Sequence, residues 1–119
     1  MKNFLAVYIG TASAREASEW ERMDAEKRKK LEASGIEAWS NWMTANKAVI
    51  VFQGGPLGKT KRAAATGIAD IKNNMTGFVI VQAESHAAAA KLFENHPHFT
   101  IFPGDSVEIM ECLPIPGQS

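Results

Sequence analysis

The sequence predicts an α+β protein of ferredoxin-like β-α-β-β-α-β order, with an antiparallel sheet and its helices on one face. Short runs of branched and aromatic residues, typical of strands, alternate with amphipathic stretches typical of helices. The chain has 119 residues, which suffices for one domain but not for a second core. With 45% apolar and 22% charged residues, it has the composition of a globular protein. We therefore expect residues 1–119 to form a single domain.

The N-terminal half predicts a strand followed by helix. Residues 4–9 are all apolar and rich in aromatic and branched side chains, which is typical of a strand buried on both faces. In residues 14–31 the apolar side chains recur at helical spacing among charged ones. Ser13 is suited to cap this helix, because its hydroxyl oxygen can accept a hydrogen bond from an unpaired amide. Gly35 predicts a break, after which residues 36–46 form a second helical piece.

The middle of the chain predicts two further strands, with a strand or hairpin arm between them. Residues 48–53 are rich in β-branched side chains and end at Gly-Gly-Pro, residues 54–56, where we expect a tight turn. Residues 59–71 are ambiguous: their alanines favour a helix, whereas their threonines, isoleucines and glycine favour a strand or hairpin arm, which is the interpretation we adopt. Residues 77–83 give the clearest strand signal in the sequence.

The C-terminal part predicts a further helix and a last strand. Ser85 can cap a helix that reaches about Asn95, and Pro97 cannot continue that helix. Residues 106–113 form the last expected strand. Beyond it, residues 114–119 are rich in proline and glycine, and we expect this tail to be loosely ordered.

Three of the expected strands are apolar on both faces, which predicts a partner for the sheet. Right-handed crossovers place both helices on the same side of the sheet, so they can cover only one of its faces. The strands concerned are residues 4–9, 48–53 and 77–83. A second copy of the chain stacked on the open face would cover it. We therefore expect a homodimer formed through the sheet.

Charge and cysteine content exclude several classes of partner. Thirteen Lys and Arg balance thirteen Asp and Glu, so no net positive field draws the chain to nucleic acid or to anionic lipid. The apolar run near the N-terminus is far shorter than a membrane span and lacks a small-residue cleavage site. Cys112 is the sole cysteine, which excludes an internal disulfide and a CxxC metal pair. These features predict a cytoplasmic protein with neither nucleic acid nor membrane as a partner.

Several short motifs occur in the order found in a known family. Gly55-Pro56 lies in a Gly-Gly-Pro-Leu segment that resembles the Asp-Gly-Pro-Phe turn of the YCII-related (DGPF-type) family, with Gly54 and Leu57 in place of Asp and Phe. The other matching segments are Thr60-Lys61, Gly77 to Val81, Ser85 to Glu94 and Val107 to Ile109. Together they cover the C-terminal half, whereas the N-terminal half matches in layout alone. The chain thus resembles this family through the order of its motifs.

The resemblance implies a dimeric α/β barrel, with a cleft between sheet and helices in each subunit. Some relatives are lyase-like or isomerase-like enzymes that use a histidine and an aspartate, whereas many have no known activity. In relatives with such a histidine, it lies on the first helix. This chain has no histidine before residue 86, so that pair of residues is not carried over.

The remaining acid/base candidates lie in and after the His-Pro-His segment. The imidazoles of His98 and His96 can take up and release a proton near neutral pH, and Asp105 could orient one of them. Binding groups often collect on loops that join rigid elements, as this segment does. The alternative is structural: His96 can interact with the dipole at a helix C-terminus, and His98 can hydrogen-bond within a loop. The residues alone leave both alternatives open.

A second group of residues could line the cleft and bind a ligand. A glycine turn can present backbone amides to an anion, and tryptophans at helical spacing can form an aromatic wall. The candidates are Gly54, Gly55, Pro56, Trp39, Trp42 and Tyr8. Each also has a plainer explanation, as a tight turn, as core side chains or, for Tyr8, as part of the dimer interface. The basic side chains within residues 59–62 could hold a carboxylate or be solvated.

Two functions from different classes therefore remain. The first is a small cofactor-independent enzyme of lyase or isomerase type, in which His98 or His96 moves a proton on a small organic molecule. The second is a non-catalytic dimeric module that binds a small ligand or serves as an accessory protein. The sequence contains no nucleotide motif and no clear metal-ligand spacing, so we expect neither a cofactor nor a metal. In both cases we expect the site near residues 96–105.

Overall fold

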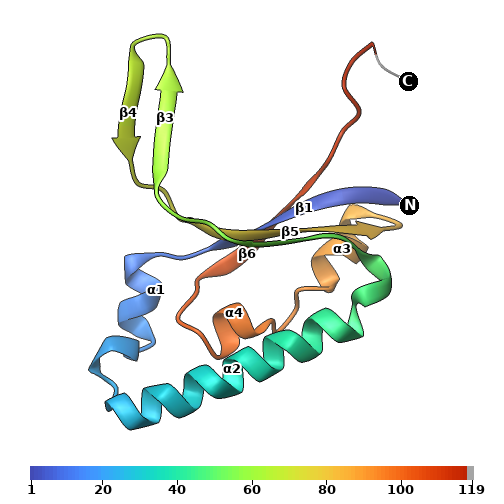
Figure 1. The fold of residues 1–119 in the computed structure, drawn as a ribbon. Coiled ribbons are helices and arrows are strands. Elements are labelled where there is room, and N and C mark those ends of the chain that lie inside the picture. The colour runs from blue at the N-terminus through green and yellow to red at the C-terminus, as the bar shows by residue number, and fades with distance from the viewer. Residues whose placement is uncertain (118–119) are drawn as a thin grey trace.

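A four-stranded antiparallel sheet forms the centre of the molecule, and its helices lie on one face (Figure 1). The computed structural model describes residues 1–117. In chain order the elements are β1 (Lys2–Ile9), α1 (Ala12–Ala17), α2 (Ala25–Ala45), β2 (Ile50–Pro56), β3 (Thr60–Ala64), β4 (Gly67–Ile71), β5 (Met75–Ala83), α3 (His86–Lys91), α4 (Pro97–Thr100) and β6 (Ser106–Glu111). The strand order β2-β5-β1-β6 is ferredoxin-like, which confirms the predicted fold class. No helix in the described range is long and apolar enough to cross a lipid bilayer.

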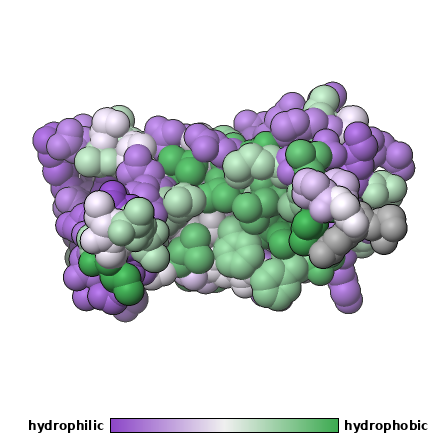
Figure 2. Space-filling view, turned by 90° about the horizontal axis from the view of Figure 1, so that it is seen from above, coloured by the Kyte–Doolittle hydropathy of each residue, from purple (hydrophilic) through white to green (hydrophobic). Residues whose placement is uncertain are grey.

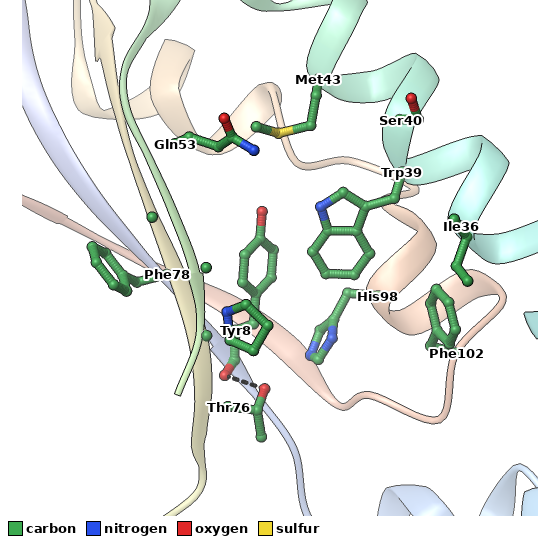
Figure 3. A pocket seen from close by; sticks show the side chains of 14 residues that line it. Tyr8, Ile36, Trp39, Ser40, Met43, Gln53, Thr76, Phe78, His98 and Phe102 are labelled. Carbon is green, nitrogen blue, oxygen red and sulfur yellow. Dashed lines mark hydrogen bonds between the residues drawn. The ribbon is translucent and has the colours of Figure 1, made fainter. Parts of the chain in front are cut away.

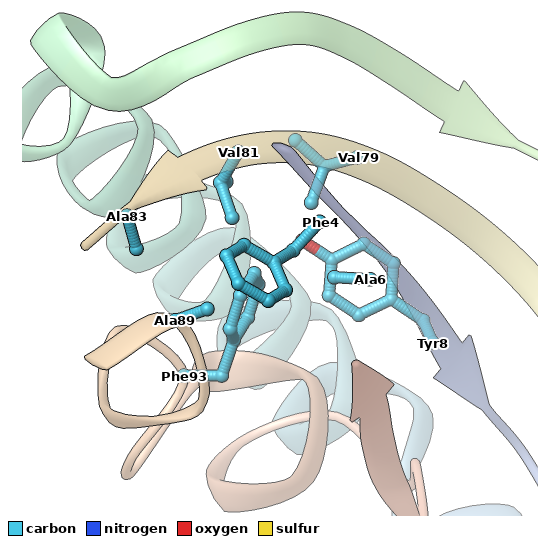
Figure 4. Close-up of a cluster of buried hydrophobic side chains, with 8 residues drawn as sticks. All are labelled: Phe4, Ala6, Tyr8, Val79, Val81, Ala83, Ala89 and Phe93. Carbon is cyan, nitrogen blue, oxygen red and sulfur yellow. The ribbon is translucent and has the colours of Figure 1, made fainter. Parts of the chain in front are cut away.

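The core lies between the central strands β1 and β5 and the helices (Figure 4). Alternate residues of a strand point to opposite faces, so Phe4, Ala6 and Tyr8 of β1 all face the helices. The antiparallel register sets Phe4 opposite Val81 and Ala6 opposite Val79, and all four side chains are almost fully buried. This packing fixes β1, the strand from which Tyr8 reaches the functional site.

The first helical region is interrupted earlier than the sequence predicts. Instead of one helix over residues 14–31, the chain forms α1, a single 3-10 turn and then α2. Thr11, and not Ser13, caps α1, because its hydroxyl oxygen accepts a hydrogen bond of 3.1 Å from the amide three residues later. The chain leaves the helix at Glu19, whose φ of 58° is left-handed. Asp24 then caps α2, so the predicted helix is divided into two helices, each with its own cap.

Gly35 lies inside α2 rather than at its end, which corrects the predicted break. The ring of Phe102 packs directly against the helix backbone at this position, and a Cβ on Gly35 would lie 2.6 Å from two ring carbons. Glycine within a helix costs about 1 kcal/mol relative to alanine. Close packing against the loop after α4 explains the glycine, since a larger residue would displace Phe102.

Residues 60–71 form a separate hairpin, which confirms the strand interpretation of this ambiguous segment. β3 and β4 pair only with each other in the strand topology, and their Lys61 and Asp70 side chains form an exposed ion pair of 2.7 Å. In Figure 1 the hairpin rises from the sheet on the face opposite the helices. The basic residues within 59–62 therefore lie on the side of the sheet opposite the helices.

The predicted tight turn at residues 54–56 is instead the end of strand β2. The register of β2 against β5 shifts between Phe52 and Gly55, which is an irregularity of the bulge type. Gly54 has a φ of 64°, a left-handed conformation that glycine adopts without a Cβ clash. The glycines thus serve to bend a paired strand rather than to reverse the chain.

The His-Pro-His segment forms the start of a short helix, where the sequence predicts a loop. Ser85 caps α3 as predicted, by accepting a hydrogen bond of 3.1 Å from the amide of Ala88. Pro97 then begins α4, because the first position of a helix requires no backbone N–H donor. His96 precedes it in an extended conformation and caps α4. α4 therefore carries both histidines of this segment, His96 as its cap and His98 in its first turn.

The last strand is two residues shorter than predicted, since β6 ends at Glu111. From there to residue 117 the chain forms neither helix nor strand, and in Figure 1 it rises on the same side of the sheet as the hairpin. Residues 118–119, the end of the predicted loose tail, lie outside the described residues.

The face of the sheet opposite the helices is open and apolar. Figure 2 shows apolar side chains gathered across this face, with hydrophilic regions around them. Leu5 and Ile80 point to it, because their neighbours along β1 and β5 point into the core. Phe52 on β2 and Met110 on β6 flank them and are 55% and 42% exposed. A single chain therefore leaves this face uncovered.

Candidate functional site

A cavity of about 580 Å³ opens between α2 and the strands β2 and β5 (Figure 3). Its volume falls in the range of about 300–1,000 Å³ that is usual for sites of small organic ligands. Figure 3 shows α2 along one side, the sheet along the other, and α4 with the loop after it closing one end. The lining residues are Tyr8, Ile36, Trp39, Ser40, Met43, Gln53, Gly54, Gly55, Pro56, Thr76, Gly77, Phe78, His98 and Phe102.

His98 is the histidine that lines the cavity. It is 7% exposed, and its Nε2 lies 2.8 Å from the carbonyl oxygen of Ile9. A carbonyl oxygen only accepts, so Nε2 carries the hydrogen and Nδ1 holds the lone pair when the ring is neutral. Burial lowers the pKa of His98, whereas the Ile9 carbonyl, the charge of Asp105 and the backbone of Ser106 act in the opposite direction. The imidazole is therefore neutral at neutral pH and free to accept a proton at Nδ1.

Backbone groups hold the His98 ring in place. The Ile9 carbonyl at the end of β1 accepts hydrogen bonds from the ring and from the amide of Asp105, the latter at 2.9 Å. The amide of Gly104 donates to the His98 carbonyl oxygen, also at 2.9 Å. A Cβ on Gly104 would collide with the imidazole, so a glycine is required where the loop closes over the ring. The end of β1 and this loop thus fix the tautomer of His98.

Asp105 lies near His98 but does not hydrogen-bond to it, unlike the orienting role that the sequence suggests. Its exposed carboxylate accepts hydrogen bonds from the hydroxyls of Ser106, at 2.8 Å, and Thr11, at 3.5 Å. The Ile9 carbonyl occupies the place at Nε2 that a carboxylate would take. Asp105 therefore acts on His98 through its charge, which opposes the lowering of the imidazole pKa by burial.

His96 is a core residue behind the cavity. It is fully buried, and its Nδ1 accepts a hydrogen bond of 3.0 Å from the amide of His98, which caps α4. Its ring packs edge-on against Trp39 and Trp42, with centroids 4.6 and 4.8 Å away. Burial, with a smaller effect of His98, lowers the pKa of His96 to about 4. This imidazole supports the site from behind and does not line it.

Tyr8 and Trp39 form the aromatic part of the cavity wall. Tyr8 is 4% exposed, and its hydroxyl has no hydrogen-bond partner among the described residues. Burial raises the pKa of this phenol, so it stays protonated and can donate. The centroids of the two rings lie 4.8 Å apart, and in Figure 3 the indole nitrogen of Trp39 is on the side of the ring nearer to the Tyr8 hydroxyl.

Trp42, predicted beside Trp39, belongs to the core. Its Nε1 donates a hydrogen bond of 2.8 Å to the carbonyl oxygen of Leu92, and its ring centroid lies 5.0 Å from that of Phe93. The helical spacing places the two tryptophans on neighbouring but different parts of α2, so one lines the cavity and the other faces the region of α3.

Gly54, Gly55 and Pro56 line the cavity from the bulged end of β2. A Cβ on Gly54 would collide with the carbonyl of Phe78, so the glycine allows β2 and β5 to approach closely here. In Figure 3 the ring of Phe78 points away from the cavity. The basic residues 59–62 contribute nothing to its lining.

Several residues that line the cavity are not predicted as site residues from the sequence. Ile36, Ser40 and Met43 follow the same helical stripe of α2 as Trp39, and this spacing was a signal that could have identified them. Phe102 gives no such signal, because its place depends on the loop that packs against Gly35. Among residues 1–117, no group of three or more His, Cys, Asp or Glu side chains is arranged to hold a metal ion.

Comparison with protein-family models and with curated proteins finds no match. Among solved structures, the fold is similar to that of 5-chloro-2-hydroxyhydroquinone dehydrochlorinase (TftG) from Burkholderia phenoliruptrix AC1100, in a complex with 2,5-dihydroxybenzoquinone. The two chains are 21% identical, and the match covers 91% of this chain and 90% of the other with a TM-score of 0.51. At this identity the likeness is one of fold, and it agrees with an α+β chain whose antiparallel sheet carries its helices on one face.

Proposed function

We propose that this chain is a small cofactor-independent enzyme of lyase or isomerase type, similar to the YCII-related family, in which His98 moves a proton on a small organic molecule. One observation carries the proposal: a buried, neutral imidazole lies in the wall of a cavity of about 580 Å³. The similar fold of a dehydrochlorinase in complex with a small quinone supports it, since that protein also accommodates a small ring.

The chemistry follows from the tautomer of His98. Nε2 donates to the Ile9 carbonyl, so Nδ1 is the atom that takes a proton from a bound molecule. The imidazolium formed would be stabilised by that carbonyl and by the charge of Asp105. Return of the proton to another atom of the same molecule completes an isomerisation, and loss of a leaving group instead completes an elimination.

The second function, a non-catalytic module that binds a small ligand, is favoured by a different observation. Asp105 does not hydrogen-bond to His98, and the ring is held by a backbone carbonyl, which cannot take up a proton. A fixed histidine of this kind can serve as a hydrogen-bonding wall for a ligand that leaves unchanged. The two functions differ in whether the bound molecule exchanges a proton.

We also propose that two copies pair through the open face of the sheet. Covering this apolar face would remove it from water, which is the main driving force for such association. The β3-β4 hairpin and residues 112–117 rise on the same side of the sheet (Figure 1), so a second copy placed there would lie between them. An isolated two-stranded hairpin is only marginally stable in water, and contact with a second copy would support it.

The enzymatic proposal is tested with cyclohex-3-en-1-one, whose conversion to the conjugated cyclohex-2-en-1-one requires one proton to leave C2 and one to arrive at C4. Ultraviolet absorbance of the conjugated product follows the reaction. We expect the wild-type chain to accelerate it and His98→Gln to lower the acceleration by at least about 100-fold, because the amide can still donate to Ile9 but cannot take up a proton.

His86→Gln is the matched control, since His86 is exposed and lies outside the cavity lining. It should retain the wild-type rate. Equal rates for His98→Gln and wild type would contradict the enzymatic proposal. Binding of the ketone without any acceleration would support the second function instead.

A further inference from the structure

The cavity carries no charged side chain in its wall. Among the described residues, none of those that line it is Lys, Arg, Asp or Glu. The nearest basic group in sequence, residues 59–62, lies beyond the end of β2 and on a hairpin that rises from the other face of the sheet. An ionised ligand would therefore lose its hydration here without gaining an opposite charge. The cavity suits an uncharged molecule.

Two hydrogen-bond donors lie close together inside this wall. The Tyr8 hydroxyl is buried without a partner among residues 1–117, and it remains protonated. In Figure 3 the indole nitrogen of Trp39 lies on the side of its ring nearer to the Tyr8 hydroxyl, and an indole nitrogen can only donate. Burying a donor without an acceptor is unfavourable, and an acceptor oxygen on a ligand would remove that cost.

His98 cannot supply the same contact in its neutral form. Its single N–H is already donated to the Ile9 carbonyl, and its remaining nitrogen accepts. The cavity thus has a donor side, at Tyr8 and Trp39, and an acceptor, at His98. Gln53 and Met43 lie beside the Tyr8 hydroxyl in Figure 3, and these flexible side chains would move aside when a ligand reaches it.

We propose that this cavity selects uncharged ring molecules that carry a carbonyl or similar acceptor oxygen, that the Tyr8 hydroxyl and the Trp39 indole donate to this oxygen, and that carboxylates are excluded. The inference deepens the proposed function, because it concerns the ligand of the same cavity. With a ketone bound, His98 takes a proton from the carbon next to the carbonyl. The C–H electron pair forms the enolate, and its negative oxygen receives the hydrogen bonds of Tyr8 and Trp39.

The test compares three probes of similar size by isothermal titration calorimetry at neutral pH: acetophenone, benzoate and toluene. Acetophenone has an acceptor oxygen and no charge, benzoate has a charge, and toluene has neither. We expect acetophenone to bind at least about tenfold more tightly than benzoate, because the carboxylate would be buried without a counter-charge.

Tyr8→Phe separates hydrogen bonding from shape. It should weaken acetophenone binding by about tenfold, the usual value of one hydrogen bond, and leave toluene binding within about twofold. The variant should fold normally, since the hydroxyl removed has no partner in the described chain. Gln53→Lys places a cation at the exposed rim of the cavity, and we expect it to shift the preference toward benzoate.

The inference is overturned if wild type binds benzoate as tightly as acetophenone, if it binds no acetophenone at millimolar concentration, or if Tyr8→Phe weakens toluene and acetophenone equally. These outcomes are independent of turnover. A chain that discriminates the three probes as expected but shows no loss of isomerisation in His98→Gln would keep the ligand class and lose the catalytic role.

Discussion

The two faces of the central sheet are built from neighbouring residues but serve different purposes. Tyr8 on β1 points to the helices and lines the cavity, whereas Val7, the residue before it, points to the opposite face. On β5, Val81 is fully buried against the helices, while its neighbour Ile80 lies on the open face. The strict alternation of a strand thus lets the same apolar segment supply a closed core with a cavity on one face and an open apolar surface on the other.

The covered face of the sheet leaves little space for larger side chains, whereas the open face leaves much. On the covered side, a Cβ on Gly35, Gly54 or Gly104 would lie so close to ring or backbone atoms that no side chain would fit. On the open side, Phe52 and Met110 remain 55% and 42% exposed. Substitutions on the first face therefore test folding and the proposed ligand site, whereas those on the second test the proposed assembly.

The largest expected effect contrasts adjacent residues of β5. Val81→Lys should prevent folding, because it buries a charge in the core without a partner. Ile80→Lys should leave the chain folded and raise the dissociation constant of the proposed dimer by at least about 100-fold, since a two-fold interface would contain the lysine twice. Circular dichroism reports folding, and analytical ultracentrifugation reports assembly. A wild-type chain that sediments as a monomer at micromolar concentration would remove the proposed dimer.

A second contrast lies within the Gly-Gly-Pro segment. Gly54→Ala should lower the free energy of unfolding by about 3 kcal/mol, because its φ of 64° is left-handed and the new Cβ would meet the Phe78 carbonyl. Gly55→Ala should change it by less than about 0.5 kcal/mol, since a Cβ there meets no atom within 4 Å. Urea unfolding of both variants measures the difference, and equal losses would contradict the strained geometry at Gly54.

A third effect, of similar size, concerns pH and the buried His96. Its pKa is about 4 in the folded chain and about 6.5 when unfolded, so the unfolded state binds more protons between these values. Stability should therefore fall as pH is lowered from about 6.5 to about 4, by up to roughly 3 kcal/mol. His96→Asn keeps an acceptor to cap α4 but cannot titrate, and its stability should change less over this window. An equally steep fall in the variant would place the titrating group elsewhere.

The order of elements could be predicted from the sequence because strand and helix signals are local. The runs of branched and aromatic residues predicted the strands, and Ser85 predicted the start of α3. The break in the first helix could not be placed, because Asp24 lies within the charged helical stretch and caps α2 only once the chain has left the helix at Glu19. Gly35 was misleading for a related reason, since its role is set by Phe102, which lies far along the chain.

The candidate site was predictable in part. Tyr8, Trp39 and the Gly-Gly-Pro segment line the cavity. The sequence could suggest them, because aromatic side chains and a glycine turn are suited to the wall of a cleft. The roles of His96 and His98 could not be separated from sequence, since Pro97 lies between them and the direction of each ring depends on α4. Tertiary packing placed one imidazole among tryptophans and the other against the Ile9 carbonyl.

The role of His98 in the cavity is tested most directly by an NMR titration of the three imidazole rings with and without acetophenone. His98 should titrate below about 6.5, the value of a free imidazole, and its ring resonances should shift when acetophenone is added, while those of exposed His86 should not. If His98 titrates like a free imidazole and stays unchanged while acetophenone shifts the Trp39 indole resonance, the imidazole does not face the ligand and the central claim is wrong.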